Sequence, residues 1–351
     1  CAFGGPLLCA LVRCLRYQRL DEVCENDSSS LFMLKCRVVG LNQHSGVFLN
    51  RSAWKLVGEP RTWRNSAHHS NALLIVPSPS MHFVVSYPKS GNTWIRLTAA
   101  AYIIPDAEPS EFLNYEGRGG EISRAMQFGD AERYYYRSVS PVKLEDVPFP
   151  VEVRLRPAAM LILEREVSIA TTDVPPLVKS HHFNGRINDI PLWHSDWADR
   201  VVNPVRDPRE VCCSFSEHLG KTYEETAEFM ADAGARITDG DLDHVHHFYS
   251  SWSNHVRGWL EADDIPVCTV RYEDLHAQPV QAFYEVFDFL DFPDLNKEHV
   301  RRAVGKTRFD KIKEAEKEHG FVEQSDHQDR FFRSGKTDGW KEELPTEVAR
   351  K

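Results

Sequence analysis

The chain has 351 residues, which is enough for one large α/β domain with appendages or for two small domains. Its formal net charge is −10, so general affinity for nucleic acid or for anionic membranes is not expected. Any site for an anionic ligand must therefore be a local concentration of positive charge.

Residues 1–80 differ in character from the rest, and we expect an amino-terminal extension there, followed by a domain over residues 81–344. The apolar stretch over residues 1–12 is too short to span a bilayer, and it is compatible with the remnant of a signal or anchor. We favour a cytoplasmic location with reduced cysteines over a secretory or organellar lumen, and expect no firm membrane association. Five of the eight cysteines lie in the extension: Cys1, Cys9, Cys14, Cys24 and Cys36.

From Met81 onward, predicted strands alternate with predicted helices, which indicates a parallel sheet covered on both faces. Ligands of such sheets bind beyond the carboxyl ends of the strands. The first of these ends is in residues 84–96, where a hydrophobic strand leads into a short polar turn and then a helix. Backbone N–H groups of such a turn point at a phosphate, Lys89 adds a charge, and Ser90 and Thr93 add donors. The turn departs from the Walker A pattern GxxxxGK[ST], so ATP is not the expected ligand.

Residues 174–182 read as a strand that ends in Lys179, Ser180 and His181. An imidazole that titrates near neutral pH suits removal of a proton from an attacking hydroxyl group, and lysines suit stabilisation of developing negative charge. His182 is a rival base. Adjacent strand residues point to opposite faces, so only one histidine of the pair should face the site.

A second cationic site is predicted in residues 200–215. Arg206 ends a strand, Pro208 opens a helix, and Ser214 lies about two turns along that helix. An arginine and a hydroxyl placed in this way suit a phosphate group.

The histidine-rich segment over residues 241–247 has the residue types of a metal site. We predict instead that Asp241 or Asp243 caps a helix that continues to Leu260. On a helix, His244 and His246 would be about 200° apart and unable to share one ion. His244 could share an ion with His247, but no third ligand is evident, and no metal is expected.

These segments follow the order found in the PAPS-dependent sulfotransferases of the cytosolic type, which use 3′-phosphoadenosine 5′-phosphosulfate (PAPS). The chain resembles that family over residues 81–341. Residues 87–94 (Tyr-Pro-Lys-Ser-Gly-Asn-Thr-Trp) look like its 5′-phosphosulfate loop, residues 179–181 like its Lys-Thr-His, and residues 206–214 like its 3′-phosphate signature. Weaker matches are residues 251–259, 270–275 and 306–313.

The closing motif of the family, Arg-Lys-Gly-x-x-Gly-Asp-Trp-Lys, is similar to residues 333–341 with two departures. Ser334 stands where the family usually has lysine, and Asp338 and Gly339 invert the usual Gly-Asp order. The polar residues 317–330 before it read as a mobile loop and a candidate lid.

The resemblance implies a three-layer α/β fold with a central parallel sheet flanked by helices and a P-loop-like strand-loop-helix. It implies in-line transfer of a sulfuryl group from PAPS to an acceptor hydroxyl or amine, with PAP as product, no metal, His181 as general base, and Lys89 and Lys179 in supporting catalytic roles. Residues 105–172 would form a long insertion that shapes the acceptor pocket. The implied nucleotide contacts are Lys89, Ser90, Gly91, Asn92, Thr93, Trp94, Arg206, Ser214, Tyr272, Thr307, Phe309, Arg333, Ser334 and Gly335.

The acceptor remains open among small molecules, carbohydrates and peptides, as does the oligomeric state. Two other functions are weighed against this one. The altered motif around Ser334 is compatible with a PAP-binding module that has lost turnover, and the strand-loop-helix is compatible with a nucleotide or small-molecule kinase. The second phosphate signature at Arg206 disfavours the kinase.

Overall fold

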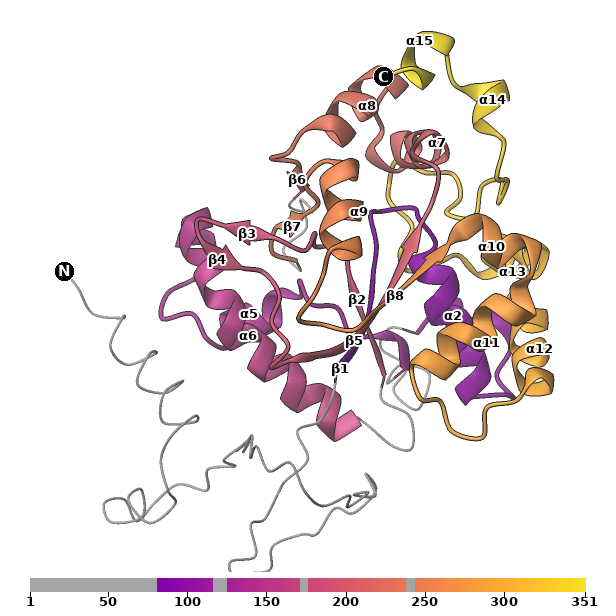
Figure 1. Cartoon of the computed structure of the whole chain (residues 1–351), viewed down its shortest axis with the longest axis horizontal. Coiled ribbons are helices and arrows are strands. Elements are labelled where there is room, and N and C mark those ends of the chain that lie inside the picture. The colour runs from indigo at the N-terminus through magenta and orange to yellow at the C-terminus, as the bar shows by residue number, and fades with distance from the viewer. Residues whose placement is uncertain (1–80, 116–124, 171–175, 238–243) are drawn as a thin grey trace, which may run out of the picture. The chain divides into compact units, whose positions relative to one another are not determined.

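The structure is a computed structural model that describes residues 81–115, 125–170, 176–237 and 244–351 (Figure 1). The predicted extension over residues 1–80 and the predicted capping residues Asp241 and Asp243 lie outside the described residues. Of the helices that the structure describes, none is both long and apolar enough to cross a membrane.

A four-stranded sheet forms the centre of the described domain. Its strands are β1 (Met81–Val85), β2 (Leu177–Ser180), β5 (Ala198–Val205) and β8 (Val267–Arg271). They are arranged in the order β2-β1-β5-β8, and every neighbouring pair is parallel. Since all five residues of β1 are buried, both faces of this strand are covered, as is usual for parallel sheets.

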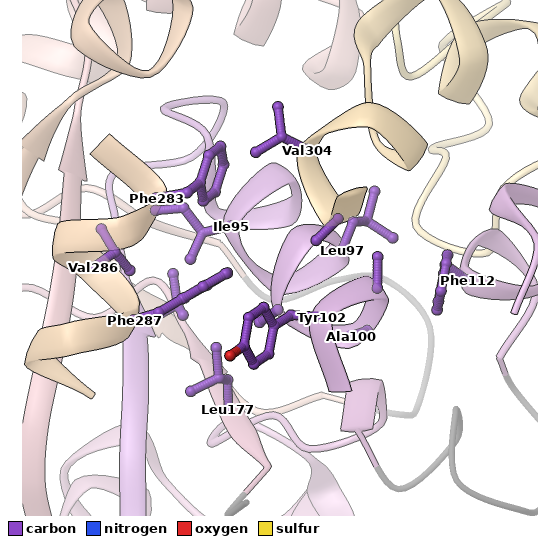
Figure 2. Close-up of a cluster of buried hydrophobic side chains, with 14 of the residues drawn as sticks. Ile95, Leu97, Ala100, Tyr102, Phe112, Leu177, Phe283, Val286, Phe287 and Val304 are labelled. Carbon is purple, nitrogen blue, oxygen red and sulfur yellow. The ribbon is translucent and has the colours of Figure 1, made fainter. Parts of the chain in front are cut away.

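Helices cover the two faces of the sheet and bury two separate apolar clusters. Val84 belongs to the cluster with α2 (Asn92–Ile103), α11 (Pro279–Phe289) and α12 (Lys297–Lys306), shown in part in Figure 2. Phe83 belongs to the opposite cluster, with α6 (Phe149–Ala170) and α9 (Trp252–Leu260). Alternate strand residues point to opposite faces, so one strand serves both layers. The predicted three-layer α/β fold is confirmed.

The remaining elements lie around this centre and are mostly short. The described part of residues 105–172 contains α3, α5, a 3₁₀ turn and α6, the longest of these elements. The further elements are α3 (Pro109–Leu113), α5 (Arg133–Arg137), η2 (Leu144–Asp146), the β3–β4 hairpin (Arg186–Ile187, Ile190–Pro191), α7 (Pro208–Leu219), α8 (Tyr223–Ala231), β6 (Arg236–Ile237), β7 (His247–Phe248), α10 (Tyr272–Ala277), α13 (Phe309–His319), α14 (Trp340–Glu343) and α15 (Thr346–Ala349).

The predicted helix over residues 241–260 is wrong in its described first half. β7 pairs with β6 in an antiparallel ribbon, and the helix α9 begins only at Trp252. Ser251 caps it by accepting a hydrogen bond from the N–H of Asn254 at 3.2 Å. The reason is tertiary packing, because the ring of Phe248 lies against those of His182 and Phe149, with centroids 5.4 and 5.1 Å away.

All four strands end at the same edge of the sheet, and each end leads into a predicted site residue. β1 continues to Lys89, β2 to His181, β5 to Arg206 and β8 to Tyr272. The chain passes from β2 across β1 to β5, so the connections diverge at this edge and leave room for a ligand between them.

The first prediction concerns the cluster in Figure 2. Phe287 is fully buried and stacks on Phe292 with centroids 4.7 Å apart. Phe287→Ala should lower the free energy of unfolding by about 3–5 kcal/mol, through lost burial and a cavity. Urea unfolding measures this. The exposed Leu260→Ala is the control and should change it by less than about 0.5 kcal/mol; equal losses would contradict the placement of Phe287.

Candidate active site

A cavity of about 770 Å³ lies at the carboxyl edge of the sheet. Its lining comes from the ends of all four strands and from the carboxyl-terminal segment around Phe331. Most of the predicted site residues line it, namely Lys89, Gly91, Asn92, Thr93, Trp94, Lys179, His181, Arg206, Ser214, Tyr272, Phe309, Arg333, Ser334 and Gly335. Residues that are far apart in the sequence are therefore brought to one place.

Two predicted nucleotide contacts, Ser90 and Thr307, do not line the cavity. Thr307 is fully buried, and its hydroxyl lies 2.8 Å from that of Thr98 and donates to the carbonyl of Ala303. The carbonyl of Thr307 accepts a hydrogen bond from Trp94 Nε1 at 3.1 Å. Thr307 therefore supports a cavity residue rather than reaching the cavity itself.

The turn after β1 has a backbone that only certain residues adopt easily. Lys89 has φ 64° and Gly91 has φ 109°, both in the left-handed region. A Cβ at Gly91 would also lie 2.9 Å from a ring carbon of Tyr272, so glycine is required there by space as well. Asn92 fixes the turn to the sheet by donating to the carbonyls of Val84 and Ser180.

Lys89 is the least compensated cation of the cavity. Its Nζ atom is buried, makes no hydrogen bond to any residue that the structure describes, and lies 3.6 Å from the ring centroid of Phe331. Burial is the main cause that lowers the pKa of Lys89 to about 7, and Arg206 adds to the effect. A bound anion would favour the charged form.

Arg206 is held on several sides. Its guanidinium donates to the carbonyl of Lys89 at 3.1 Å, to Glu210 Oε2 at 3.0 Å and to the carbonyl of Lys336 at 2.9 Å. It also lies over the ring of Tyr272, 4.3 Å from the centroid. Arg206 therefore joins the turn after β1 to the carboxyl-terminal segment.

The segment Arg333–Gly335 wraps closely against Phe309. Gly335 has φ 62°, and a Cβ there would lie 2.6 Å from the Phe309 ring, so this glycine is required. Arg333 pairs with Glu343 and, at 3.4 Å, with Glu217.

Several buried donors of these segments have no hydrogen-bond partner among the residues that the structure describes. They are Lys89 Nζ, Ser90 Oγ, Arg206 Nε and Arg333 Nε. Buried donors without partners are costly, and their concentration around one cavity fits an anionic ligand with more than one charged group.

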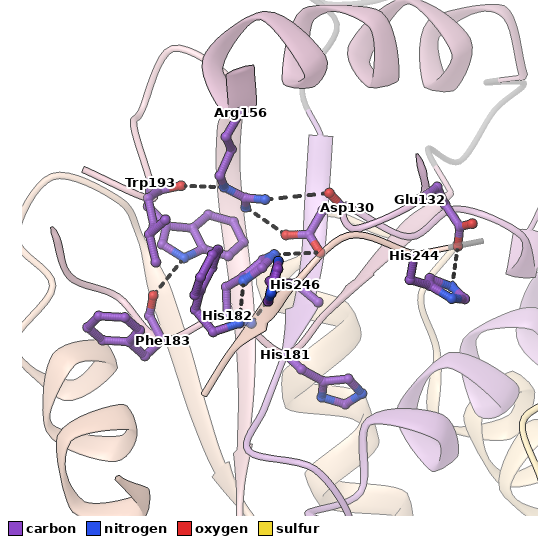
Figure 3. A network of polar contacts seen from close by, with 12 residues as sticks. Asp130, Glu132, Arg156, His181, His182, Phe183, Trp193, His244 and His246 are labelled. Atoms are coloured by element: carbon purple, nitrogen blue, oxygen red, sulfur yellow. Dashed lines mark hydrogen bonds and ion pairs between the residues drawn. The ribbon is translucent and has the colours of Figure 1, made fainter. Parts of the chain in front are cut away.

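His181 is turned away from the buried network of Figure 3, and it faces the cavity. Its Nδ1 lies 2.9 Å from the carbonyl of Ser86, which can only accept, so Nδ1 carries the proton and Nε2 is left as an acceptor. Burial, with the charge of Lys179 next, lowers the pKa of His181 to about 3. The ring is therefore neutral with Nε2 unprotonated, but at this pKa it is a weaker base than the histidine titrating near neutral pH that the sequence predicts.

His182 belongs to the opposite side and is fully buried. Its Nδ1 accepts from the N–H of Phe248, and its Nε2 faces Asp130 Oδ1 at 3.8 Å. Asp130 in turn pairs with Arg156 at 2.7 Å, as Figure 3 shows. The two adjacent histidines thus have different surroundings, as strand alternation predicts.

Two other histidines of this region pair with carboxylates. His244 Nε2 lies 3.2 Å from Glu132, and His246 Nδ1 lies 3.0 Å from Glu152. In the part of the chain that the structure describes, no group of three or more histidine, cysteine, aspartate or glutamate residues is placed to hold a metal ion.

Sequence reasoning missed Glu323, whose carboxylate lines the cavity and pairs with Arg96 at 2.7 Å. The prediction of a loop over residues 317–330 is confirmed for residues 320–330, while its mobility and its role as a lid stay predictions. Its first three residues end α13, Phe321 is buried in the core, and Glu323 is held by buried partners. Only Arg96, the one charged residue of α2, gave a local signal that a buried partner exists.

Comparison with known proteins identifies the family. The model of the sulfotransferase domain family matches residues 79–351. Sulfotransferase 1B1 of the dog (Canis lupus familiaris) is 22% identical over 271 residues, covering 76% of this chain and 77% of that protein. Sulfotransferase 1B1 of the mouse (Mus musculus) is 24% identical over 247 residues, covering 68% and 67%.

Solved structures give a weaker likeness. Retinol dehydratase in complex with androsterone and inactive cofactor PAP has a TM-score of 0.49 and 19% identity, with 78% of each chain covered. Mouse sulfotransferase SULT7A1 complexed with PAP has a TM-score of 0.46 and 17% identity, with 78% of this chain and 81% of that chain covered. Because the family model spans residues 79–351, which include every residue of the cavity, this chain belongs to the sulfotransferase family.

Proposed function

We propose that this protein transfers a sulfuryl group from PAPS to a hydroxyl or amine group of an acceptor by in-line displacement. The observation that carries the proposal is the convergence of Lys89, Lys179, His181, Arg206 and Arg333 on one cavity. A neutral base thus lies among cations, which is what attack on an anionic sulfuryl donor requires.

In this step a lone pair of the acceptor oxygen forms a bond to sulfur. The bond from sulfur to the bridging oxygen of the 5′-phosphate breaks, and PAP leaves with that electron pair. The acceptor proton passes to His181 Nε2, which Ser86 leaves free to accept by holding Nδ1. Lys89 and Lys179 stabilise the charge on the sulfuryl and leaving-group oxygens.

The two phosphate groups of the donor occupy different parts of the cavity lining. The 5′ side binds at Lys89 and the turn before α2, whose first N–H groups have no partner in the helix. The 3′-phosphate binds between Arg206, Ser214 and Arg333. The aromatic rings of Trp94, Tyr272 and Phe309 line the cavity between these groups and suit a flat base.

The acceptor binds on the opposite side, against described residues of the stretch 105–172 such as Gln127, Phe128 and Glu132. This lining mixes polar and apolar groups and suits a small molecule or the end of a sugar or peptide.

The domain limits 1–80 and 81–344 and a cytoplasmic location stay predictions. The described Cys212, Cys213 and Cys268 are free thiols, which a reducing compartment would maintain.

The separate 3′ site predicts a preference among nucleotides. PAP should stabilise the protein far more than AMP, by about 2.7 kcal/mol at a hundredfold excess over Kd. Arg206→Ala should abolish the preference, because a charge-assisted bond to phosphate contributes on the order of 1.5–3 kcal/mol. Thermal shift and calorimetry measure both. Arg209→Ala, a half-exposed neighbour outside the cavity lining, is the control and should keep the preference; equal stabilisation of the parent by AMP contradicts the 3′ site.

The proposed base distinguishes an enzyme from a PAP-binding module. His181→Ala should lower kcat by roughly 10² to 10⁴ and leave PAP affinity nearly unchanged, because only proton transfer is lost. The buried His182→Ala should lower stability while keeping far more of kcat. Turnover of labelled PAPS over a panel of phenols, sterols, sugars and peptides provides the assay. Absence of transfer by the parent protein itself would favour the binding module.

The lowered pKa of Lys89 predicts a pH dependence of binding. In the free protein Lys89 loses its proton as the pH rises through about 7, whereas a bound phosphate holds the proton on. PAP binding should therefore take up a proton above pH 7, and affinity should fall by up to about tenfold per pH unit there. Titration calorimetry in buffers of different ionisation enthalpy measures this uptake. Lys89→Met should bind more weakly and lose the uptake; an uptake that persists in this variant would assign it to another group.

A further inference from the structure

A buried carboxylate, that of Glu323, lies inside this anion-binding cavity. Its Oε1 accepts from Arg96 Nη1 at 2.7 Å and from the Tyr115 hydroxyl at 3.0 Å. Its Oε2 accepts from the Thr93 hydroxyl at 3.0 Å and lies 3.3 Å from Lys179 Nζ. The side chain is 8% exposed, so these four groups are its main surroundings.

Glu323 differs from the other carboxylates that pair with cations of the site. Glu210 pairs with Arg206, and Glu217 and Glu343 pair with Arg333, but none of these three lines the cavity. Glu323 does. A negative charge at this position opposes anion binding. Glu323 therefore needs a role other than neutralising the positive charge of the site.

The surroundings of Glu323 hold it in one place and in the ionised state. Burial favours the protonated acid, but Lys179 and Arg96 keep the pKa of Glu323 well below its usual value. Arg96 is only 1% exposed, and departure of Glu323 would leave its charge buried without a counter-ion, which is strongly unfavourable. The neighbouring backbone is fixed too, because the N–H of Val322 donates to the carbonyl of Leu113.

The two partners of Oε2 differ in what they can still offer to a ligand. Thr93 has one hydroxyl proton and donates it to Glu323, so it offers a ligand its backbone N–H. Lys179 has three N–H donors, and the pair with Glu323 uses one. Glu323 can therefore hold the ammonium group in place while two donors remain for the sulfuryl oxygens.

We propose that Glu323 is a positioning residue for sulfuryl transfer, which fixes Lys179 at the cavity while Arg96 and Tyr115 fix Glu323 itself. This inference rests on the proposed function. A lysine has four flexible side-chain bonds, and holding its charge in one orientation lowers the cost of ordering it during the reaction.

The test is the variant Glu323→Gln, which keeps the shape and removes the charge. Its kcat should fall about 10- to 100-fold, the usual effect of a misplaced catalytic group. Its Kd for PAP should stay the same or decrease, because PAP carries no sulfuryl group and one negative charge has left the cavity. A merely structural role would weaken binding and turnover together.

A double-mutant cycle shows whether Glu323 acts through Lys179. In a Lys179→Ala background, Glu323→Gln should lower kcat by less than about twofold further. The exposed Glu318→Gln removes a carboxylate that does not line the cavity, so it is the control, and its kcat should stay within about threefold of the parent. If Glu323→Gln does not fold, Glu323→Asp replaces it, since it keeps the counter-ion of Arg96 while withdrawing the carboxylate from Lys179.

Three results would overturn the inference: a kcat within twofold of the parent in the Glu323 variant, a parallel loss of kcat and PAP affinity, or full additivity with Lys179→Ala. A rise of both kcat and PAP affinity would show instead that Glu323 competes with the donor. If the parent protein transfers no sulfuryl group from labelled PAPS to any acceptor of the panel, the proposed function fails, and the positioning role fails with it.

Discussion

The site depends on holding several cations close together at the carboxyl edge of one sheet. Like charges at such distances repel, and burial removes the water that would screen them. The fold meets this constraint with internal counter-ions, such as Glu210 for Arg206 and Glu343 for Arg333. Lys89 has the face of an aromatic ring instead, and its lowered pKa is the consequence. The arrangement of these counter-ions therefore decides which cation has the pKa that changes most when an anion binds.

The same constraint explains why the carboxyl-terminal segment is an integral part of the site. Glu210 accepts from the N–H of Trp340 at 2.9 Å, and Arg206 donates to the carbonyl of Lys336. Glu323 from the same segment reaches Thr93 and Arg96 in α2. Segments of the chain that are 130 to 230 residues apart are thus joined by buried polar contacts, so the turn after β1 and this segment depend on each other.

The two adjacent histidines, His181 and His182, lie in different surroundings. His181 keeps Nε2 free at the cavity because Ser86 occupies Nδ1, whereas His182 is used by Phe248 and faces Asp130. Both residues follow Ser180, the last residue of β2, and their side chains still point to opposite sides, as they would on a strand. The buried contacts of His182 with Phe248 and Asp130 also help to fix the backbone at the end of β2, which carries Lys179 and His181.

The sequence by itself determined the three-layer fold and the strand ends at Lys89, His181 and Arg206. Those features follow from local causes: runs of apolar residues, a turn that needs glycine, a proline at a helix start and strand alternation. It also determined that one histidine of the pair should face the cavity. Each of these signals is contained within about fifteen residues, and a short window of sequence therefore carries it.

Only the tertiary structure decided which polar side chains meet. The helix expected over residues 241–260 gave way to a strand at His247–Phe248, because packing against His182 and Phe149 outweighed local preference. Thr307 proved to support Trp94 from outside the cavity. Glu323 meets its partner Arg96 across 227 residues, and such a pairing leaves no periodicity or spacing in the sequence. Contacts of this kind arise from the close packing of distant segments, so a local pattern such as the lone charge of Arg96 cannot identify the partner.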